Sequence, residues 1–452
     1  MENRLNEIDL LRGLAVIGMI FSGILPFNGS LPAWMYHAQV PPPKHIFDPA
    51  IPGLTWVDLV FPFFLFSMGA VIPAVIPANL EKIGIKNTFF QLFKRFVLLL
   101  SLAVISFNFA PLRNIGAENM ADLAGIATYA ALFLIFCLFP GILPARSFSL
   151  KISGVFLLFG LLYIKNVFWG GLNIQNNDSI LRVLANVYIV GAILWYVSKD
   201  NETLRIGFIF LIVSAYLGDM ETGYMQDFWR WQDPWNLISP YLLKYLVLFL
   251  LGTMAGDWLI KKVFIFQKLT FQWDYFILSL LITFCILTGL FQRNLSLTLM
   301  SVVLGLSFFY YRQKLKNESE SVKSKLFYAG IFILFCGLLM EPFQGGVKKD
   351  PSTLSYFFIT GGLAFILIYA FMYMNTSKLD LYVNPVKSLG KNALMAYFIS
   401  GFFIVPLFNL SGFSAVLGLS PHLLVLKAFL VTFLSGAMVH YLTKKGFFWK
   451  IG

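Results

Sequence analysis

The chain has 452 residues, of which 58% are hydrophobic and only 12% are charged, whereas a soluble domain carries about 25% charged residues. No soluble core could bury so much apolar surface, so the composition excludes a soluble protein and indicates an integral membrane protein. The net charge of +12 does not indicate a nucleic-acid partner, because Lys and Arg form short clusters between apolar runs, as membrane topology produces.

Apolar segments long enough to cross a bilayer, which takes about 20 residues, recur along the whole chain. We therefore expect an all-α, polytopic bundle with about fourteen transmembrane helices; because several runs are short, about twelve is the alternative. In chain order the segments are about 10–27, 57–78, 93–110, 122–143, 151–168, 180–197, 204–218, 237–259, 275–291, 295–311, 326–341, 353–374, 390–409 and 422–442.

The charges between these segments predict their orientation, since Lys and Arg accumulate in cytoplasmic loops. With the N-terminus inside and the segments alternating, the inner loops carry about three times as many Lys and Arg as the outer loops. Both termini are therefore expected in the cytoplasm. Lys244 falls within a span, where it either extends to the surface or serves an outward-facing cavity. Cys137, Cys285 and Cys336 lie in apolar runs without paired spacing, and we expect no metal site.

Three outer segments are unusually polar and aromatic, namely 28–56, 218–236 and 341–353. Carboxylates beside aromatic rings suit a sugar, because acids accept its hydrogen bonds and rings cover its apolar face. A belt of aromatic residues at the bilayer surface is the alternative for the Trp residues. The candidate substrate-binding residues are Trp34, Asp219, Glu221, Trp229, Trp231, Asp233 and Lys348.

The first outer segment also holds His37 and His45. Imidazole accepts a proton near neutral pH, as acyl transfer to an amine or hydroxyl requires; an ordinary exposed loop residue is the alternative for each. Asp58 opens the second helix, where the helix dipole favours a carboxylate, so a structural and a chemical role are both open. Asp9 and Arg12 are three residues apart and are expected to pair on one helix face.

Several of these segments also carry a family resemblance. The N-terminal block consists of Arg4–Gly18 (RLNEIDLLRGLAVIG), the histidine loop and Gly53–Gly69 (GLTWVDLVFPFFLFSMG). Further segments are Asp233–Gly256, Val347–Tyr356 (VKKDPSTLSY), Gly390–Tyr397 (GKNALMAY) and the C-terminal KKGFFWKIG. Together they resemble the heparan-α-glucosaminide N-acetyltransferase family of transmembrane acyltransferases, the chain being similar to a bacterial, DUF5009-like member.

The resemblance implies an activity and a site. Relatives move an acetyl group from cytoplasmic acetyl-CoA to an amino sugar beyond the membrane, and an outer-loop His is central to the transfer. His37, followed by Ala38, fits the family's His-Ala pair. His45 lies closer to the family's distance from Gly53 and is the alternative. Asp58 would orient the imidazole. The resemblance also implies a multi-pass protein of the bacterial inner membrane, and a homodimer is compatible with it.

The sequence departs from the family at Tyr188-Ile189, where relatives carry Gln-Arg, and at Ser400 and Ser22-Gly23, where they carry His and Asn. The resemblance therefore implies one acyltransferase domain over residues 1–452 without identifying the acceptor. Two helix pairs, near 122–168 and 275–311, look additional. A secondary transporter of a sugar-like solute, which would show repeats and broken helices, and a non-catalytic protein of envelope assembly are the alternative functions.

Overall fold

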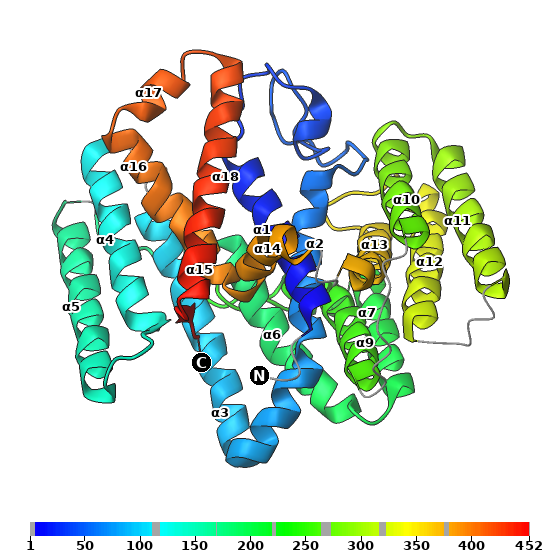
Figure 1. Ribbon diagram of the computed structural model, residues 1–452, viewed down its shortest axis with the longest axis horizontal. Coiled ribbons are helices and arrows are strands. Elements are labelled where there is room, and N and C mark those ends of the chain that lie inside the picture. Colours follow the sequence, from blue (N-terminus) through cyan, green and yellow to red (C-terminus); the bar gives the residue numbers. More distant parts are fainter. Residues whose placement is uncertain are drawn as a thin grey trace.

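The computed structural model describes residues 5–110, 118–168, 170–218, 223–263, 273–315, 322–374 and 379–451 (Figure 1). Helices account for nearly all of its regular structure. The elements are α1 (Asn6–Ile24), η1 (Ala33–Met35), α2 (Trp56–Ala70), α3 (Ile72–Phe109), α4 (Glu118–Phe136), β1 (Cys137–Leu138), α5 (Pro144–Phe168), α6 (Ser179–Ser198), α7 (Glu202–Gly218), α8 (Tyr224–Arg230), η3 (Pro240–Tyr245), α9 (Leu246–Val263), α10 (Trp273–Phe291), α11 (Leu295–Leu315), α12 (Val322–Met340), η4 (Pro342–Gln344), α13 (Leu354–Met374), α14 (Asp380–Lys391), α15 (Ala393–Ile399), η5 (Ser400–Ile404), α16 (Val405–Leu410), α17 (Phe413–Leu417), α18 (Pro421–Lys444) and β2 (Phe448–Trp449).

Every predicted membrane segment coincides with helical structure. Among the described residues, 10 stretches are long and apolar enough to cross a membrane, and one of them, Trp56–Phe109, contains two predicted segments. The remaining three predicted segments are α1, which is more charged, and α7 and α12, which are shorter. The chain is therefore an all-α, multi-pass membrane protein.

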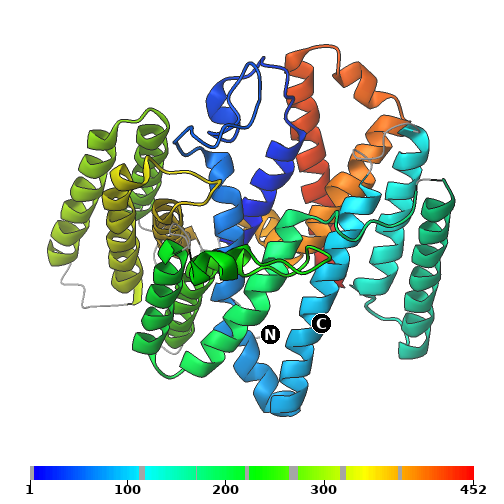
Figure 2. The ribbon, with the colours of Figure 1, turned by 180° about the vertical axis from the view of Figure 1, so that it is seen from behind.

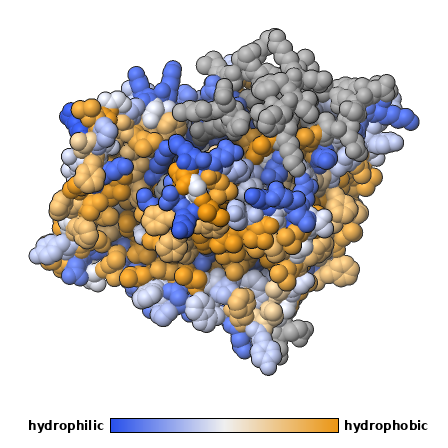
Figure 3. Space-filling model, turned by 90° about the horizontal axis from the view of Figure 1, so that it is seen from below, coloured by the Kyte–Doolittle hydropathy of each residue, from blue (hydrophilic) through white to orange (hydrophobic). Residues whose placement is uncertain are grey.

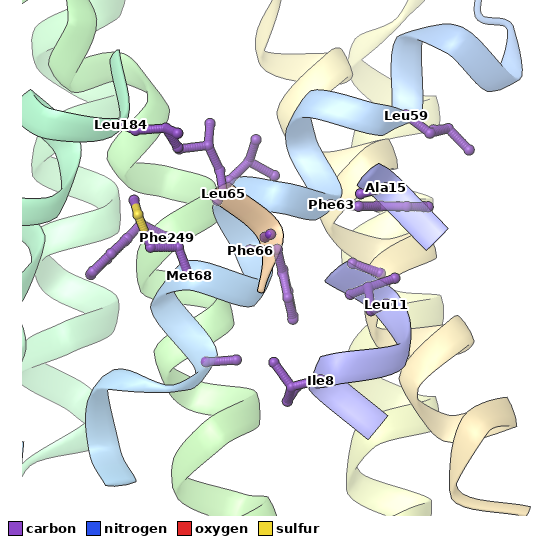
Figure 4. Close-up of a cluster of buried hydrophobic side chains, with 14 of the residues drawn as sticks. Ile8, Leu11, Ala15, Leu59, Phe63, Leu65, Phe66, Met68, Leu184 and Phe249 are labelled. Atoms are coloured by element: carbon purple, nitrogen blue, oxygen red, sulfur yellow. The ribbon is translucent and has the colours of Figure 1, made fainter. Parts of the chain in front are cut away.

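The core of the bundle lies around α13, which is buried along almost its whole length. Helices α2, α9 and α12 pack against it. Beside them, apolar side chains from α1, α2, α6 and α9 fill one continuous cluster, in which Leu11, Phe63, Phe66 and Phe249 are buried (Figure 4). A helix buried on all sides needs no polar face, which explains why α13 carries no charged residue.

Two helix pairs approach each other at glycines. A Cβ atom on Gly252 of α9 would lie 2.0 Å from the carbonyl oxygen of Phe66 in α2. A Cβ atom on Gly390 of α14 would lie 1.9 Å from the carbonyl oxygen of Asp9 in α1. Small residues allow membrane helices to pack backbone against backbone. The first contact fixes α9 against α2, which carries Asp58 at its start, and the second fixes α14 against α1.

The long helix α3 is bent into two arms at Gly84, whose φ of 77° is left-handed and suits glycine. Asn79 donates a hydrogen bond to Gln91 across the bend at 3.3 Å. The bend forms the lowest point of the molecule in Figure 1. It lies at the same end as both termini, because Leu5, Ile83 and Ile451 line one cavity.

The helix pairs α4–α5 and α10–α11 lie on opposite flanks of the molecule (Figures 1 and 2). Only 11% of the most apolar stretch of α5 is buried, and only 22% of the most apolar stretch of α11 is buried. Both pairs therefore present broad apolar surfaces. The antiparallel pairing of Cys137 with Trp449 and of Leu138 with Phe448 ties α4 to the C-terminus. That these pairs are additions to a smaller domain remains a prediction.

Candidate functional site

Asp58 joins the start of α2 to His37. Thr55 precedes the helix and Asp58 follows three residues later, which is the spacing of a helix-capping pair. One carboxylate oxygen of Asp58, Oδ2, accepts hydrogen bonds from the backbone N–H groups of Thr55 (3.0 Å) and Ala38 (3.2 Å). The other, Oδ1, lies 2.7 Å from Nδ1 of His37. These contacts establish the structural role of Asp58 at the start of α2, and the His37 contact is compatible with the chemical role, which stays a prediction.

The contact with Asp58 determines which nitrogen of His37 carries its proton. The Asp58 carboxylate is approached by His37 Nδ1, by two backbone N–H groups and by the Thr55 hydroxyl, which lies 3.1 Å from Oδ2, and an ionised carboxylate only accepts hydrogen bonds. Nδ1 of His37 is therefore the protonated nitrogen of the neutral ring, and Nε2 has the lone pair. Asp58 is 2% exposed, whereas the His37 side chain is 32% exposed. The ring is thus held from a buried side and presents a basic nitrogen outward.

A lysine that was not among the predicted residues completes the cluster. Nζ of Lys349 lies 3.2 Å from Nε2 and 3.4 Å from Nδ1 of His37. An ammonium group bound in the ring plane on the Nε2 lone pair would lie much closer to Nε2 than to Nδ1. The near-equal distances place Nζ beside the ring, off the axis of that lone pair.

The loop that carries Lys349 is bonded to the histidine loop. The side-chain amide of Gln39 donates to the carbonyl oxygen of Asp350 (2.6 Å), and the backbone N–H of Asp350 donates back to Gln39 Oε1 (2.9 Å). The backbone N–H of Gly53 donates to the carbonyl oxygen of Val347 at 2.8 Å. These reciprocal bonds hold residues 347–350 against the loop that presents His37.

Tyrosines support the same loop from the bundle side. Tyr216 donates to the carbonyl oxygen of Ser352 at 2.6 Å. Tyr245 lies 2.9 Å from the Ser352 hydroxyl, which itself donates to the carbonyl oxygen of Lys349 at 2.7 Å. Lys244 is 2% exposed, and its ammonium lies 3.5 Å from the centre of the Tyr241 ring. Of the two alternatives for Lys244, extension to the surface is wrong, because its ammonium is buried among tyrosine rings.

His45 has a structural position. Its φ of 50° is left-handed, and its Nε2 accepts a hydrogen bond from the backbone N–H of Gly29 at 3.0 Å. Its ring packs against Tyr36 and Phe27 at centroid distances of 4.5 and 5.3 Å. His45 therefore stabilises the fold of the histidine loop through these contacts. The geometry favours His37 over His45 as the candidate catalytic imidazole.

The predicted acid and aromatic segment 218–236 is only partly in keeping with a sugar site. Trp229 is 2% exposed and its indole N–H donates to the carbonyl oxygen of Ala215. The Asp233 carboxylate accepts hydrogen bonds from the backbone N–H groups of Trp235 and Leu237, so it organises its own turn. Both side chains have structural partners, and Asp219 and Glu221 lie outside the described residues.

The other predicted substrate residues lie at the surface. Trp34, on the histidine loop, and Trp231 are each 53% exposed. The Lys348 side chain extends beside Gly345, so the structure brings Lys349 rather than Lys348 to the imidazole. Within the described ranges, no three His, Cys, Asp or Glu side chains are grouped to hold a metal ion.

Sequence reasoning missed Lys349 and Gln39. The only available signal for Lys349 was its position beside Lys348 in VKKDPST, and two adjacent loop lysines look alike in a sequence. Gln39 follows the His-Ala pair but carries no chemistry of its own. Both are found only when the loops at 37–55 and 347–353 are seen to pair.

A second feature lies at the opposite end of α2. A cavity of about 950 Å³ opens between α1, α2, α3, α14 and the C-terminal residues. Its walls include Phe64 and Met68 of α2 and Leu184 of α6. Seen from the end that carries the termini, hydrophilic side chains interrupt the hydrophobic surface (Figure 3). This cavity is large enough for an extended small molecule.

The cavity lining is strongly basic. It contains one acid, Asp9, and the cations Arg12, Lys82, Arg95, Lys391 and Lys450. Asp9 and Arg12 lie 3.9 Å apart, which confirms their predicted pairing. The Arg95 guanidinium lies 4.6 Å from the centre of the Tyr188 ring, at a position where the sequence departs from the resembled family. Arg95 Nε is buried without a hydrogen-bond partner among the described residues.

Comparison with known proteins gives one result. A search of curated proteins finds no match. A family model described as a domain of unknown function (DUF5009) matches residues 4–259, which is more than half of the chain. The match includes the histidine loop, Asp58 and most of the basic cavity lining, and it ends before Lys349. The chain therefore belongs to the DUF5009 family.

Proposed function

We propose that this protein is a transmembrane acetyltransferase of the bacterial inner membrane. It moves an acetyl group from acetyl-CoA, bound at the end that carries the termini, to an amino sugar or glycan at the other end. The observation that supports this proposal is the arrangement of the two features along α2. A carboxylate-held imidazole lies at the start of the helix, and a large basic cavity lies beside its later turns.

The cavity has the chemistry that the donor requires. The phosphates of a coenzyme A ester bind to cations, and the cavity is lined by Lys82, Arg95 and Lys391. Phe64 is the lining residue of α2 nearest to Asp58 in sequence. Phe64 is six positions after Asp58, which is about 9 Å along a helix axis. The acyl arm of the donor has to pass this last stretch to bring its thioester to His37.

At the outer end, His37 acts on the acceptor. In direct transfer, Nε2 takes the proton of the acceptor amine while the amine attacks the thioester carbon, and it returns that proton to the departing thiolate. In covalent transfer, Nε2 itself attacks the thioester carbon, the C–S bond breaks and the coenzyme A thiolate leaves. The acceptor amine then attacks the acetyl-imidazole, the C–Nε2 bond breaks, and the freed Nε2 takes the amine proton. Asp58 stabilises the positive charge on the ring in both routes, because its carboxylate contacts Nδ1 directly.

The outer face supports an acceptor with a ring-shaped apolar face. Trp34 belongs to the histidine loop and is exposed, so it is the aromatic residue that we assign to stacking against the sugar. Trp231 is equally exposed. Trp229 and Asp233 are not assigned to the acceptor, because both are committed to local hydrogen bonds. Lys348 is not assigned to it either, because its ammonium lies beside Gly345 while that of Lys349 lies at the imidazole.

The test is acetyl transfer by the purified protein in detergent. Labelled acetyl-CoA is incubated with a panel of amino sugars, and labelled product and labelled protein are both measured. His37→Asn and His45→Asn form a matched pair, since Asn tolerates the left-handed backbone at position 45. His37→Asn is expected to abolish transfer, whereas His45→Asn is expected to retain it within about threefold, an effect of less than 1 kcal/mol.

Other outcomes lead to other functions. Full transfer by the His37→Asn variant would remove His37 from the mechanism. Loss of transfer in His45→Asn alone would make His45 the reactive imidazole. Sugar uptake into proteoliposomes without acetyl-CoA, unchanged by His37→Asn, would identify a transporter. Absence of acetyl-CoA binding altogether would favour a protein of envelope assembly.

A further inference from the structure

We infer that Lys349 is a catalytic residue of this site, where its ammonium group stabilises the oxyanion that forms as the acetyl group is transferred. The inference rests on the proposed function and adds to it a charge that neither His37 nor Asp58 supplies. The observation that supports it is the position of Lys349 Nζ, 3.2 Å from His37 Nε2 and 3.4 Å from Nδ1.

The position of Nζ suits an oxyanion better than it suits the ring nitrogen. Nζ lies off the axis of the Nε2 lone pair, so Nε2 can still approach a proton or a carbonyl carbon. When the acetyl carbonyl carbon reaches Nε2, its oxygen lies one bond away from the carbon that reacts. A cation beside the ring can then reach that oxygen, and oxyanion donors act at about 2.7–3.1 Å.

The bonding changes show when the charge is needed. The acceptor amine attacks the thioester carbon, a C–N bond forms, and the carbonyl π electrons move to oxygen, which becomes negative. His37 Nε2 takes the amine proton. The oxyanion then re-forms the carbonyl, the C–S bond breaks, and the thiolate takes the proton from Nε2. Lys349 keeps its own protons throughout and stabilises the negative oxygen by charge and hydrogen bonding.

The same argument applies to the covalent route. When Nε2 attacks the thioester carbon, an oxyanion forms at the same carbonyl oxygen, and a second one forms when the amine attacks the acetyl-imidazole. In both steps the oxygen lies next to the ring nitrogen that Lys349 already contacts. The assignment of Lys349 therefore does not depend on which route the protein uses.

The surrounding contacts hold Lys349 in place, as oxyanion stabilisation requires of a preorganised group. Gln39 makes two hydrogen bonds with the backbone of Asp350, and the Ser352 hydroxyl bonds to the Lys349 carbonyl at 2.7 Å. The backbone is thus fixed on both sides of the residue. Lys348 is its natural control, because the neighbouring side chain extends beside Gly345 instead.

The experiment compares Lys349→Met, Lys349→Arg and Lys348→Met in the acetyl-transfer assay. Lys349→Met removes the charge and keeps much of the side-chain shape. We expect its kcat to fall about 100-fold or more, the usual cost of losing one oxyanion donor. The KM and the separately measured Kd for acetyl-CoA are expected to stay within about threefold, because the proposed donor cavity lies at the other end of α2. Lys349→Arg is expected to recover at least about tenfold of the loss, since it restores a cation.

The outcomes separate this inference from the proposed function. If His37→Asn is inactive but Lys349→Met keeps the wild-type kcat, Lys349 is not catalytic although the proposed function stands. If Lys349→Met and Lys349→Arg lose kcat and melting temperature together, the residue is structural and the inference is overturned. If the wild-type protein transfers no acetyl group to any acceptor, both proposals are overturned. An unchanged Lys348→Met variant beside a slow Lys349→Met variant supports the inference.

Discussion

At the scale of single residues, Asp58 has two roles to separate: it caps the start of α2, and it contacts His37, the proposed catalytic imidazole. It accepts hydrogen bonds from two backbone N–H groups and from His37. In Asp58→Asn, the amide oxygen can still accept from the backbone, but the amide N–H₂ faces His37 and turns Nδ1 into the acceptor. The proton then sits on Nε2, so we expect acetyl transfer to fall on the order of 10³-fold.

Two measurements check this prediction. The melting temperature of Asp58→Asn is expected to correspond to a loss of no more than about 1 kcal/mol, because the amide oxygen at this N3 position still accepts the backbone N–H of the N-cap residue, Thr55. Asp58→Ala is expected to lose both activity and stability, since it removes the carboxylate that completes the capping box with Thr55 and that contacts His37. An active Asp58→Asn variant would show that the tautomer of His37 is irrelevant to the reaction.

Residues also show where prediction from the sequence ended. The pairing of Asp9 with Arg12 follows from helical spacing alone, and the structure confirms it. The His37–Asp58 contact required the resemblance, because a loop of undefined shape separates the two. Trp229 and Asp233 look in the sequence like sugar ligands, yet each bonds to backbone nearby. Composition does not distinguish a side chain that binds a ligand from one that shapes a turn.

At the scale of elements, α2 and α9 form the most sensitive contact. Gly252→Ala places a methyl group 2.0 Å from the Phe66 carbonyl oxygen, where the opposing atom is backbone and cannot move alone. We expect a loss of about 1–3 kcal/mol, typical of overpacking. Since α2 also presents Asp58, the shift is expected to lower acetyl transfer. Thermal unfolding in detergent measures the first effect, and the transfer assay measures the second.

Gly160→Ala is the matched control. Gly160 lies in α5, and nothing lies within 4 Å of its added Cβ atom. The same substitution there relieves the backbone entropy cost of glycine and is expected to leave the melting temperature unchanged or slightly raised. Equal destabilisation by both substitutions would show that the cost comes from losing glycine, and not from the close approach of α2 and α9.

The elements were largely predictable, because apolar runs of membrane length leave little choice but a helix. The two arms of α3 were predicted within separate segments, 57–78 and 93–110, but the helical bend at Gly84 that joins them was not predicted. Residues 79–92 contain Gly84 among residues of mixed helix propensity, and one glycine in a helical pattern is often tolerated. Its left-handed φ of 77° and the Asn79–Gln91 contact across it depend on how the two arms pack, which neighbouring residues do not reveal.

At the scale of the whole molecule, the distribution of loop charges and the position of the basic cavity indicate the same cytoplasmic end. The distribution of Lys and Arg predicts cytoplasmic termini, and the basic cavity lies at the end of the bundle where Leu5 and Ile451 meet. The His37 loop connects the opposite end of α1 to the start of α2. A donor from the cytoplasm and an acceptor from outside would therefore approach the protein from opposite faces.

This arrangement predicts a sided reaction in proteoliposomes. Acetyl-CoA supplied only on the side of the termini, with an amino sugar only on the other side, is expected to yield acetylated sugar on the sugar's side. Acetyl-CoA supplied only on the side of the His37 loop is expected to yield none, because the basic cavity does not open there. Proteolysis of a C-terminal tag reports the orientation, and a bilayer-opening detergent restores access to both faces. Equal rates from both sides in intact, uniformly oriented vesicles would contradict a donor site in the basic cavity.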